Sequence, residues 1–258
     1  MAELTALVLA GRRGSEDATG VRHKALLEVA GVPMLLRVVR CLRASPVIGR
    51  VIVSIDEPKV LEAAPELAAL IAAGELALHT SLSSPSRSVH DVLEREDGGG
   101  TLLVTTADHA LLTPEIVEHF AAGAEASEAD MAVGTVAISR VLARYPEAVR
   151  TVLKLRGEGW CGANLFAFRT ARGRRAAEFW VRAESFRKRP WRLVSAFGPV
   201  TLLLFLLRRL DLESALTRVS RAMGAHVRAI PLPFPEAAID VDNPRDFALA
   251  SRILADRS

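Results

Sequence analysis

Short apolar runs alternate along this chain with segments of helical pattern, and this alternation constrains the fold more than any other feature. The first run, residues 4–10, is almost uniformly apolar and stops at Gly11, which is typical of a strand buried on both faces of a parallel sheet. Similar runs predict strands at residues 50–55, 101–106, 131–138 and 164–168. Helical patterns between them predict helices at residues 33–42, 58–73, 86–96 and 114–122. This order predicts an α/β fold with a mostly parallel central sheet and helices on both faces, and a ligand site beyond the carboxyl ends of the strands.

The alternation breaks over about residues 171–224, where helix-like sequence carries a basic cluster and an apolar run. Three elements follow, the last of them a helix that Asn243 is suited to cap: a strand at 227–232, an extended segment at 238–242 and a helix at 244–254. A chain of 258 residues that is 50% hydrophobic has enough apolar surface for one core. We therefore expect one domain over residues 1–258 with a helical, basic and apolar insertion at about 171–224.

The cysteine content and the start of the chain suggest a compartment. The chain has two cysteines, Cys41 and Cys161, and its first residues lack the basic start and long apolar stretch of a secretory signal. No window reaches the ~20 apolar residues of a spanning helix. We expect a cytoplasmic protein without disulfides.

The charge is unevenly distributed. The net charge of +3 gives no reason to expect nucleic-acid binding, and we expect none. Residues 1–150 carry fourteen basic and twenty acidic side chains, whereas residues 151–258 carry nineteen and ten. Residues 169–192 hold nine basic and two acidic side chains, and an apolar run follows. Three interpretations of residues 169–210 stay open: a solvated basic helix beside a buried one, a pocket for a phosphorylated acceptor, or a peripheral contact with membrane or lipid phosphate.

A glycine-containing loop, residues 11–20, follows the first predicted strand. Backbone N–H groups in such a loop approach phosphates closely, and basic side chains in it neutralise them. The loop lacks the G-K-[ST] ending of a P-loop and the G-x-G-x-x-G pattern of a dinucleotide-binding fold, which argues against an NAD(P)-dependent oxidoreductase. Lys24 is one of four lysines among thirty-three basic residues, which suggests that a compact point charge is needed there. The alternative is a solvated turn.

Acidic residues stand where predicted strands end. Asp108 directly follows a buried strand, and Asp240 and Asp242 alternate in the extended segment 238–242. Carboxylates at such positions suit Mg²⁺, which prefers oxygen ligands and often bridges substrate phosphates. Alternation puts Asp240 and Asp242 on opposite faces, so we expect one of them to meet the same ion as Asp108. The other caps the last helix or reaches the metal through water. Purely structural turn and cap roles are the alternative for both acidic segments.

Taken together and in this order, these segments resemble the MobA-like nucleotidyltransferases, of the GT-A-like, Rossmann-related fold. The family opening, L-A-A-G-x-G-x-R-x-G followed by P-K-x-L-x-x-x-x-G-x-P-[ML], is similar to residues 9–14 and 23–35, with Arg12 in place of a glycine and His23 in place of the proline. The closing segment D-[IV]-D-T-P-E-D-L is similar to residues 240–247. The similarity spans most of the chain.

The resemblance implies roles for individual residues. Asp108 and Asp240 hold Mg²⁺, with Asp242 as a further candidate ligand, and Lys24 acts in catalysis by neutralising phosphate charge. Asn164, in a segment similar to the family's G-x-N-L turn, is the candidate acceptor contact. Ser88 is carried over from the nucleotide-contacting R-x-x-S-V stretch, where Pro85 takes the place of the arginine. The implied nucleotide-binding residues are Leu9, Ala10, Gly11, Arg13, Gly14, Lys24 and Ser88.

The implied activity is Mg²⁺-dependent transfer of an NMP unit from an NTP to a phosphorylated small-molecule acceptor, with release of pyrophosphate. One alternative is a catalytically weak nucleotide-binding or regulatory protein, which the altered glycine loop would suit. Another is a glycosyltransferase that uses a nucleotide-sugar, although the Asp-x-Asp metal motif of such enzymes is absent at Asp108, which precedes His109 and Ala110.

Overall fold

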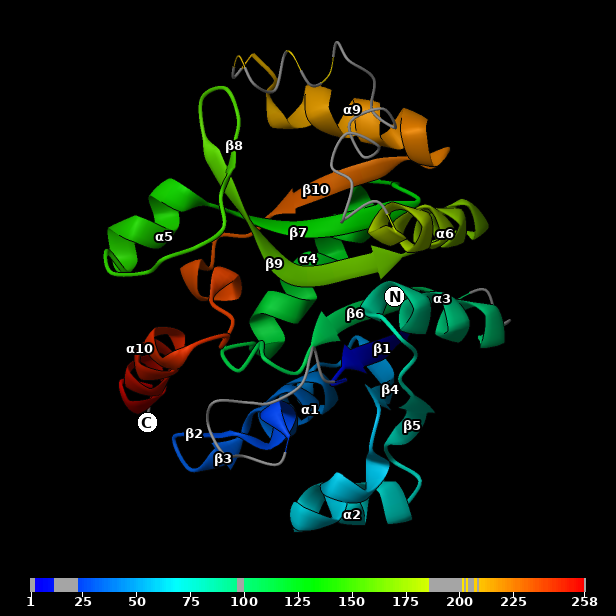
Figure 1. The fold of residues 1–258 in the computed structure, drawn as a ribbon, viewed down its shortest axis with the longest axis vertical. Coiled ribbons are helices and arrows are strands. Elements are labelled where there is room, and N and C mark those ends of the chain that lie inside the picture. Colours follow the sequence, from blue (N-terminus) through cyan, green and yellow to red (C-terminus); the bar gives the residue numbers. More distant parts are fainter. Residues whose placement is uncertain are drawn as a thin grey trace.

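The computed structural model of the protein describes residues 3–11, 23–96, 100–185, 201, 203, 207 and 209–257. A central sheet runs through the molecule, and helices lie against it (Figure 1). The strands of this sheet are β1 (Leu4–Leu9), β4 (Ile48–Ile55), β5 (Ala77–Thr80), β6 (Leu102–Thr106), β7 (Met131–Ala137), β8 (Leu153–Lys154), β9 (Gly159–Phe168) and β10 (Val227–Pro231). A small separate ribbon pairs β2 (Glu28–Val29) with β3 (Val32–Pro33).

The strand order confirms the predicted mostly parallel sheet. Within the described residues the order is β10-β7-β9-β6-β1-β4-β5, with β8 added beside β9. The strands β6, β1, β4 and β5 are parallel neighbours, and β10 is parallel to β7. β9 is antiparallel to both β6 and β7, so it separates the two parallel groups.

Helices cover both faces of the sheet, as predicted. The helices are α1 (Met34–Ala44), α2 (Pro65–Ala72), α3 (Pro85–Arg95), α4 (Pro114–Ala126), α5 (Ile138–Arg144), α6 (Ala171–Ser185), α9 (Leu212–Met223) and α10 (Pro244–Ala255). Successive side chains of β1 divide between two buried clusters, with Ala6 and Val8 in one and Leu7 in the other. The first cluster includes side chains of α1, α4 and α10, and the second includes side chains of α3, α6 and α9. This double burial explains why the strands are apolar without alternation.

Several element boundaries differ from the predictions. The helix predicted at 58–73 is two pieces, the 3₁₀ turn η2 (Pro58–Ala63) and α2, because Pro65 keeps the preceding Ala64 extended. The run at 131–138 ends at Ala137, where α5 begins directly. β5 and α5 were missed because both are short, and periodicity in so few residues is a weak signal.

The extended segment predicted at 238–242 does not pair as a strand. Its beginning belongs to the 3₁₀ turn η3 (Pro235–Ala238), and the remainder is held by a hydrogen bond from Val241 N to the Asp108 carbonyl at 3.0 Å. The prediction of a capping asparagine is confirmed. The Asn243 side chain accepts hydrogen bonds from the backbone N–H groups of Arg245 and Asp246 at the start of α10.

The insertion supplies α6 and α9 on the face of the sheet that carries α3 (Figure 1). Its segment 186–200 lies outside the described residues, as do 202, 204–206 and 208, so much of the basic cluster and of the apolar run is outside the description. In the part of the chain that is described, no helix is both long enough and apolar enough to cross a membrane. The expectation of a single domain stays a prediction.

Candidate active site

The strand order places a topological switch point at β1. The chain leaves β1 toward β4 and β5 on one side and then returns to form β6 on the other side. The connections therefore diverge at the carboxyl ends of β1 and β6, the position at which open α/β sheets bind ligands. Gly11 follows β1 and Asp108 follows β6, so both predicted site segments lie at this switch point.

Lys24 is held by a short, buried turn. It begins the 3₁₀ turn η1 (Lys24–Leu26), whose N-cap is His23. The His23 side chain is 1% exposed; its Nδ1 accepts from Ala25 N at 3.3 Å and its Nε2 lies 3.0 Å from an Asp56 carboxylate oxygen. His23 is thus suited to its place because it caps the turn and joins it to the residue after β4.

The Lys24 ammonium joins two acidic segments. Its Nζ lies 3.1 Å from Asp108 Oδ2 and 2.6 Å from Asp242 Oδ1. Burial by itself would lower the pKa of Lys24, but the nearby carboxylates of Asp108 and Asp242 outweigh it and raise that pKa above its ordinary value. Lys24 therefore stays positively charged throughout the neutral range.

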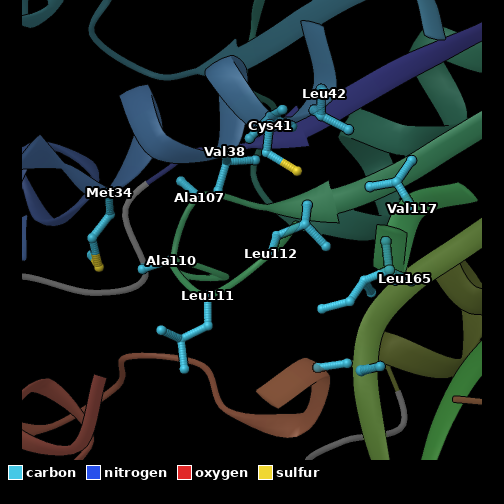
Figure 2. Close-up of a cluster of buried hydrophobic side chains, with 14 of the residues drawn as sticks. Met34, Val38, Cys41, Leu42, Ala107, Ala110, Leu111, Leu112, Val117 and Leu165 are labelled. Carbon is cyan, nitrogen blue, oxygen red and sulfur yellow. The ribbon is translucent and has the colours of Figure 1, made fainter. Parts of the chain in front are cut away.

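Asp108 is anchored by apolar neighbours. Ala107, Ala110 and Leu111 belong to the same buried cluster as Met34 and Leu165, and Figure 2 shows their side chains there. The carboxylate itself stays partly exposed and accepts a hydrogen bond from the Thr106 hydroxyl. The turn after β6 is thus fixed by packing while its one acidic side chain reaches Lys24.

Asp240 lies on the other side of this group, between Asn164 and Arg150. Asn164 Nδ2 donates to Asp240 Oδ2 at 3.1 Å, and Arg150 donates to Asp240 Oδ1. Burial is the largest influence on the pKa of Asp240 and raises it; Asp242 and Asp108 raise it further, and Arg150 opposes them. Asp242 and Asp108 thus both act on the Asp240 carboxylate.

Carboxylate oxygens are the donors that a divalent cation would meet at this site. Among the residues that the structure describes, no group of three or more His, Cys, Asp or Glu side chains is arranged to hold a metal. Mg²⁺ is commonly held by one or two carboxylates together with substrate phosphates, so a three-residue cage is not required. Asp242 and Asp108 disfavour the charged form of Asp240, an effect that a cation bound beside Asp240 would relieve, and carboxylate oxygens are donors that suit Mg²⁺.

Some of the remaining predicted nucleotide-binding residues lie within the described part of the chain and some lie outside it. Leu9 ends β1 and Ala10 follows it, next to Gly11. Their backbone groups bond to neighbouring segments of the sheet: Leu9 O accepts from Ala107 N, and Ala10 N donates to Ser54 O. Ser88 is 2% exposed, and its hydroxyl accepts from Leu82 N at 2.9 Å, so it fixes the loop before α3. Arg13 and Gly14 lie outside the described residues. Nucleotide contact by any of these residues stays a prediction.

Two residues of the site were missed by the sequence reasoning. The guanidinium of Arg150 is 7% exposed and bridges the carboxylates of Asp240 and Asp246. Asp246 also accepts from Asn243 Nδ2 at 2.7 Å. The Asn243-x-x-Asp246 spacing resembles a capping box and is a signal for Asp246. Arg150 lies 90 residues from Asp240 and has no such signal.

Comparison with known proteins identifies the family. The model of the MobA-like NTP transferase domain matches residues 6–188. The chain belongs to this family. As a MobA-like NTP transferase it is a nucleotidyltransferase, which confirms the resemblance seen in the sequence. The matched region contains Lys24, Asp108 and Asn164, whereas Asp240 and Asp242 lie beyond it and reach the site through the fold.

Solved structures share the fold of this MobA-like chain. A structure described as a hypothetical transferase from Thermus thermophilus is 28% identical, with a TM-score of 0.79, and the match covers 96% of this chain and 100% of that one. A second, CMP:2-keto-3-deoxy-manno-octonic acid synthetase in complex with CTP, is 15% identical with a TM-score of 0.61, and both chains are covered completely. No curated protein gave a significant match.

Proposed function

We propose that this MobA-like NTP transferase moves an NMP unit from an NTP to a phosphorylated small-molecule acceptor and releases pyrophosphate, with Mg²⁺ as its metal. The observation that carries the proposal is the convergence of Lys24, Asp108, Asp240 and Asp242 at the switch point of the sheet. A cation beside acidic metal-ligand candidates is the charge pattern that phosphoryl transfer requires. The solved relative in complex with CTP supports a nucleoside triphosphate as donor.

Lys24 supplies the fixed positive charge in this proposal. Its raised pKa keeps it cationic, and its ion pairs with two carboxylates hold it at the switch point of the sheet. There it would pair with phosphate oxygens of the triphosphate and offset the charge that develops on the leaving pyrophosphate. Lysine suits this role because its ammonium is a compact point charge.

Asp108 and Asp240 would hold Mg²⁺, and Asp242 is the third candidate ligand. When bound, Mg²⁺ supplies neutralisation of the triphosphate charge and polarisation of the phosphate under attack. Arg150 and Asn164 keep the Asp240 carboxylate in place through its two oxygens. Asp240 is therefore oriented before any substrate binds, which limits the cost of assembling the site.

The reaction itself needs no general base. An ionised phosphate oxygen of the acceptor attacks the α-phosphorus in line, a new P–O bond forms, and the bond to the β,γ-diphosphate breaks so that pyrophosphate leaves. Asn164 is the candidate contact for the acceptor, and its side-chain amide lies beside Asp240. The residues of this site thus act by positioning and by charge.

The test is thermal stabilisation by ATP, GTP, CTP and UTP, each with and without Mg²⁺. A ligand at 100 times its dissociation constant adds about 2.7 kcal/mol of stability, which shifts the melting temperature measurably. We expect selective, Mg²⁺-dependent stabilisation by one nucleotide, lost in Asp108→Asn and kept in the control Asp256→Asn, an exposed position at the end of α10.

Turnover completes the test. With the nucleotide identified, pyrophosphate release is measured against a panel of phosphorylated small molecules, and at least one acceptor should support it. Stronger stabilisation by nucleotide-sugars than by any NTP would favour a glycosyltransferase instead. Binding of an NTP without turnover on any acceptor would favour a nucleotide-binding regulatory protein.

A further inference from the structure

The Asp108 carboxylate has a protein donor on each of its oxygens. Oδ1 accepts from the Thr106 hydroxyl, and Oδ2 lies 3.1 Å from Lys24 Nζ. Thr106 is 9% exposed and belongs to β6, so its hydroxyl is held in place by the sheet. Of the two donors, only Lys24 carries a positive charge. A divalent cation on Asp108 would therefore share this carboxylate with the Lys24 ammonium.

The same ammonium also holds Asp242. Lys24 Nζ lies 2.6 Å from Asp242 Oδ1, so one cation joins the predicted metal ligand Asp108 to the third candidate ligand. Two cations that share a carboxylate repel each other, and partial burial strengthens the repulsion because less water screens it. Contact of Lys24 with both carboxylates and firm binding of a metal ion to them therefore oppose each other.

The other cation of the site is fixed. The Arg150 side chain is 7% exposed, and its guanidinium bridges the carboxylates of Asp240 and Asp246. The Lys24 side chain is 34% exposed, and its ammonium ends a flexible stem of four carbon atoms. Rotations within that stem can carry the charge from a carboxylate to a nearby phosphate. Lys24 is thus the cation that can exchange partners, while Arg150 stays on Asp240.

We propose that Lys24 competes with Mg²⁺ for Asp108 and Asp242 in the protein without nucleotide, and that a bound triphosphate ends this competition by drawing the ammonium to its own oxygens. The proposal rests on the proposed function and concerns how the donor and the metal enter the site. The triphosphate gives Lys24 a new anionic partner and leaves Asp108 and Asp242 to the metal. Metal alone should then bind weakly, and metal and NTP should strengthen each other's binding.

Mn²⁺ binding to the nucleotide-free protein is the direct test. Mn²⁺ takes the same kind of oxygen ligands as Mg²⁺, and its free concentration is measured by electron paramagnetic resonance. We expect Lys24→Met to bind Mn²⁺ about 10- to 100-fold more tightly than the wild type, the range for one hydrogen bond to a charged group. Damage to the site would instead weaken Mn²⁺ binding. Lys24→Gln, whose amide can still donate to one carboxylate, should show a smaller gain.

Arg245→Met is the matched control for the lost charge. Arg245 is exposed and lies three residues after Asp242. Its removal lowers the positive charge near the site without removing Lys24 from Asp108 or Asp242. Because exposed charges are screened by salt, we expect the Mn²⁺ affinity to change by about 2-fold at most.

NTP binding without metal should change in the opposite direction. The NTP that stabilises the wild type best is titrated by calorimetry in the presence of a chelator. Lys24→Met should weaken this binding about 10-fold, because the phosphates lose their cationic partner. The two measurements together separate an ammonium that exchanges partners from one that stays on the carboxylates.

Three outcomes would overturn the proposed competition. These are a Mn²⁺ affinity in Lys24→Met that does not exceed that of the wild type, an equal gain in Arg245→Met, and unchanged metal-free NTP binding in Lys24→Met. If the wild type binds an NTP and turns it over in any of these cases, the proposed function stands and the competition alone is rejected. A wild type that binds none of the four NTPs with Mg²⁺ contradicts the proposed function itself.

Discussion

At the scale of single residues, the site depends on charges that other charges hold in place. Lys24 and Asp108 are 84 positions apart in the chain, and their 3.1 Å contact requires the strands that precede them to be neighbours in the sheet. Each charge is partly buried, so neither is fully stabilised by water. Burial would lower the pKa of Lys24, but the carboxylates of Asp108 and Asp242 raise it above its ordinary value. For Asp240, burial and the neighbouring carboxylates act in the same direction and raise the pKa.

Removal of the Lys24 charge should impair the reaction more than the fold. In Lys24→Gln we expect kcat for pyrophosphate release to fall about 100-fold, the scale seen when one transition-state charge contact is lost. Lys59→Gln, at an exposed lysine of η2, is the matched control. Steady-state kinetics with the preferred nucleotide provides the measurement, and a kcat within a few-fold of the wild type would contradict the role given to Lys24.

The buried thiol of Cys41 should make the folded state less stable at alkaline pH. Burial, followed by Glu115 and Glu118, raises the pKa of its thiol from the ordinary 9.0 to about 12. The unfolded thiol therefore ionises first, so this contribution is complete below pH 9.0 and is lost as the pH rises toward 12. Between about pH 9 and about pH 10.5, urea unfolding should show a smaller loss of stability in Cys41→Ala than in the wild type. Val39→Ala, a truncation in the same helix without an ionisable group, should keep the wild-type slope.

At the scale of elements, the start of α10 organises the acidic segment. Asn243 caps the helix and donates to Asp246, and Asp246 in turn accepts from Asp242 N at 3.3 Å. The cap therefore fixes the backbone from which Asp242 and Asp240 project. Pro65 marks another element boundary: the turn η2 ends before it, and helix α2 begins at it.

Loss of this cap should affect stability and the site together. Asn243→Ala is expected to cost about 1 to 2 kcal/mol in the free energy of urea unfolding. It should also weaken Mg²⁺-dependent nucleotide binding, because the acidic segment loses its anchor. Asn243→Ser, which keeps a capping oxygen, should restore most of the stability. Arg245→Ala, a change at the exposed neighbouring residue, should alter neither the stability nor the nucleotide binding. An equal loss of stability in this variant would show that the effect comes from the helix in general and not from the cap.

At the scale of the whole molecule, α6 joins the insertion to the sheet. A Cβ on Gly173 would lie 2.3 Å from the backbone oxygen of Asp130, just before β7. Arg169 N donates to the same oxygen at 2.9 Å, and Arg174 donates to the backbone oxygens of Leu93 and Glu96 at the end of α3. These contacts tie the start of α6 to the end of α3 and to the segment before β7.

Gly173→Ala tests this junction. The added methyl meets backbone, which cannot move aside cheaply, so we expect a loss of about 1 to 3 kcal/mol. Gly100→Ala, where the same addition meets nothing within 4 Å, is the control. If the insertion and sheet form one domain, thermal unfolding followed by tryptophan fluorescence and by circular dichroism should give one coincident transition in each variant. Two separate transitions would show that the insertion is a domain of its own.

The sequence by itself determined the fold class, most of the parallel strands, the capped last helix and the family. These follow from local features, namely apolar runs, turn residues and motif spacing, which need no knowledge of long-range contacts. It also pointed to Lys24, Asp108 and Asp240 as the residues that would carry the chemistry. The short elements β5 and α5 were not predictable, because too few residues carry their periodicity.

Only the tertiary structure decided how these residues are paired. Arg150 gives no signal in the chain, yet burial between Asp240 and Asp246 makes it part of the acidic site. The same holds for His79 of β5, whose ring lies between Ser54 of β4 and Asp91 of α3. The physical reason is common to both. The direction of a hydrogen bond or the partner of a buried charge depends on which strands the fold makes neighbours, and no local pattern encodes that choice.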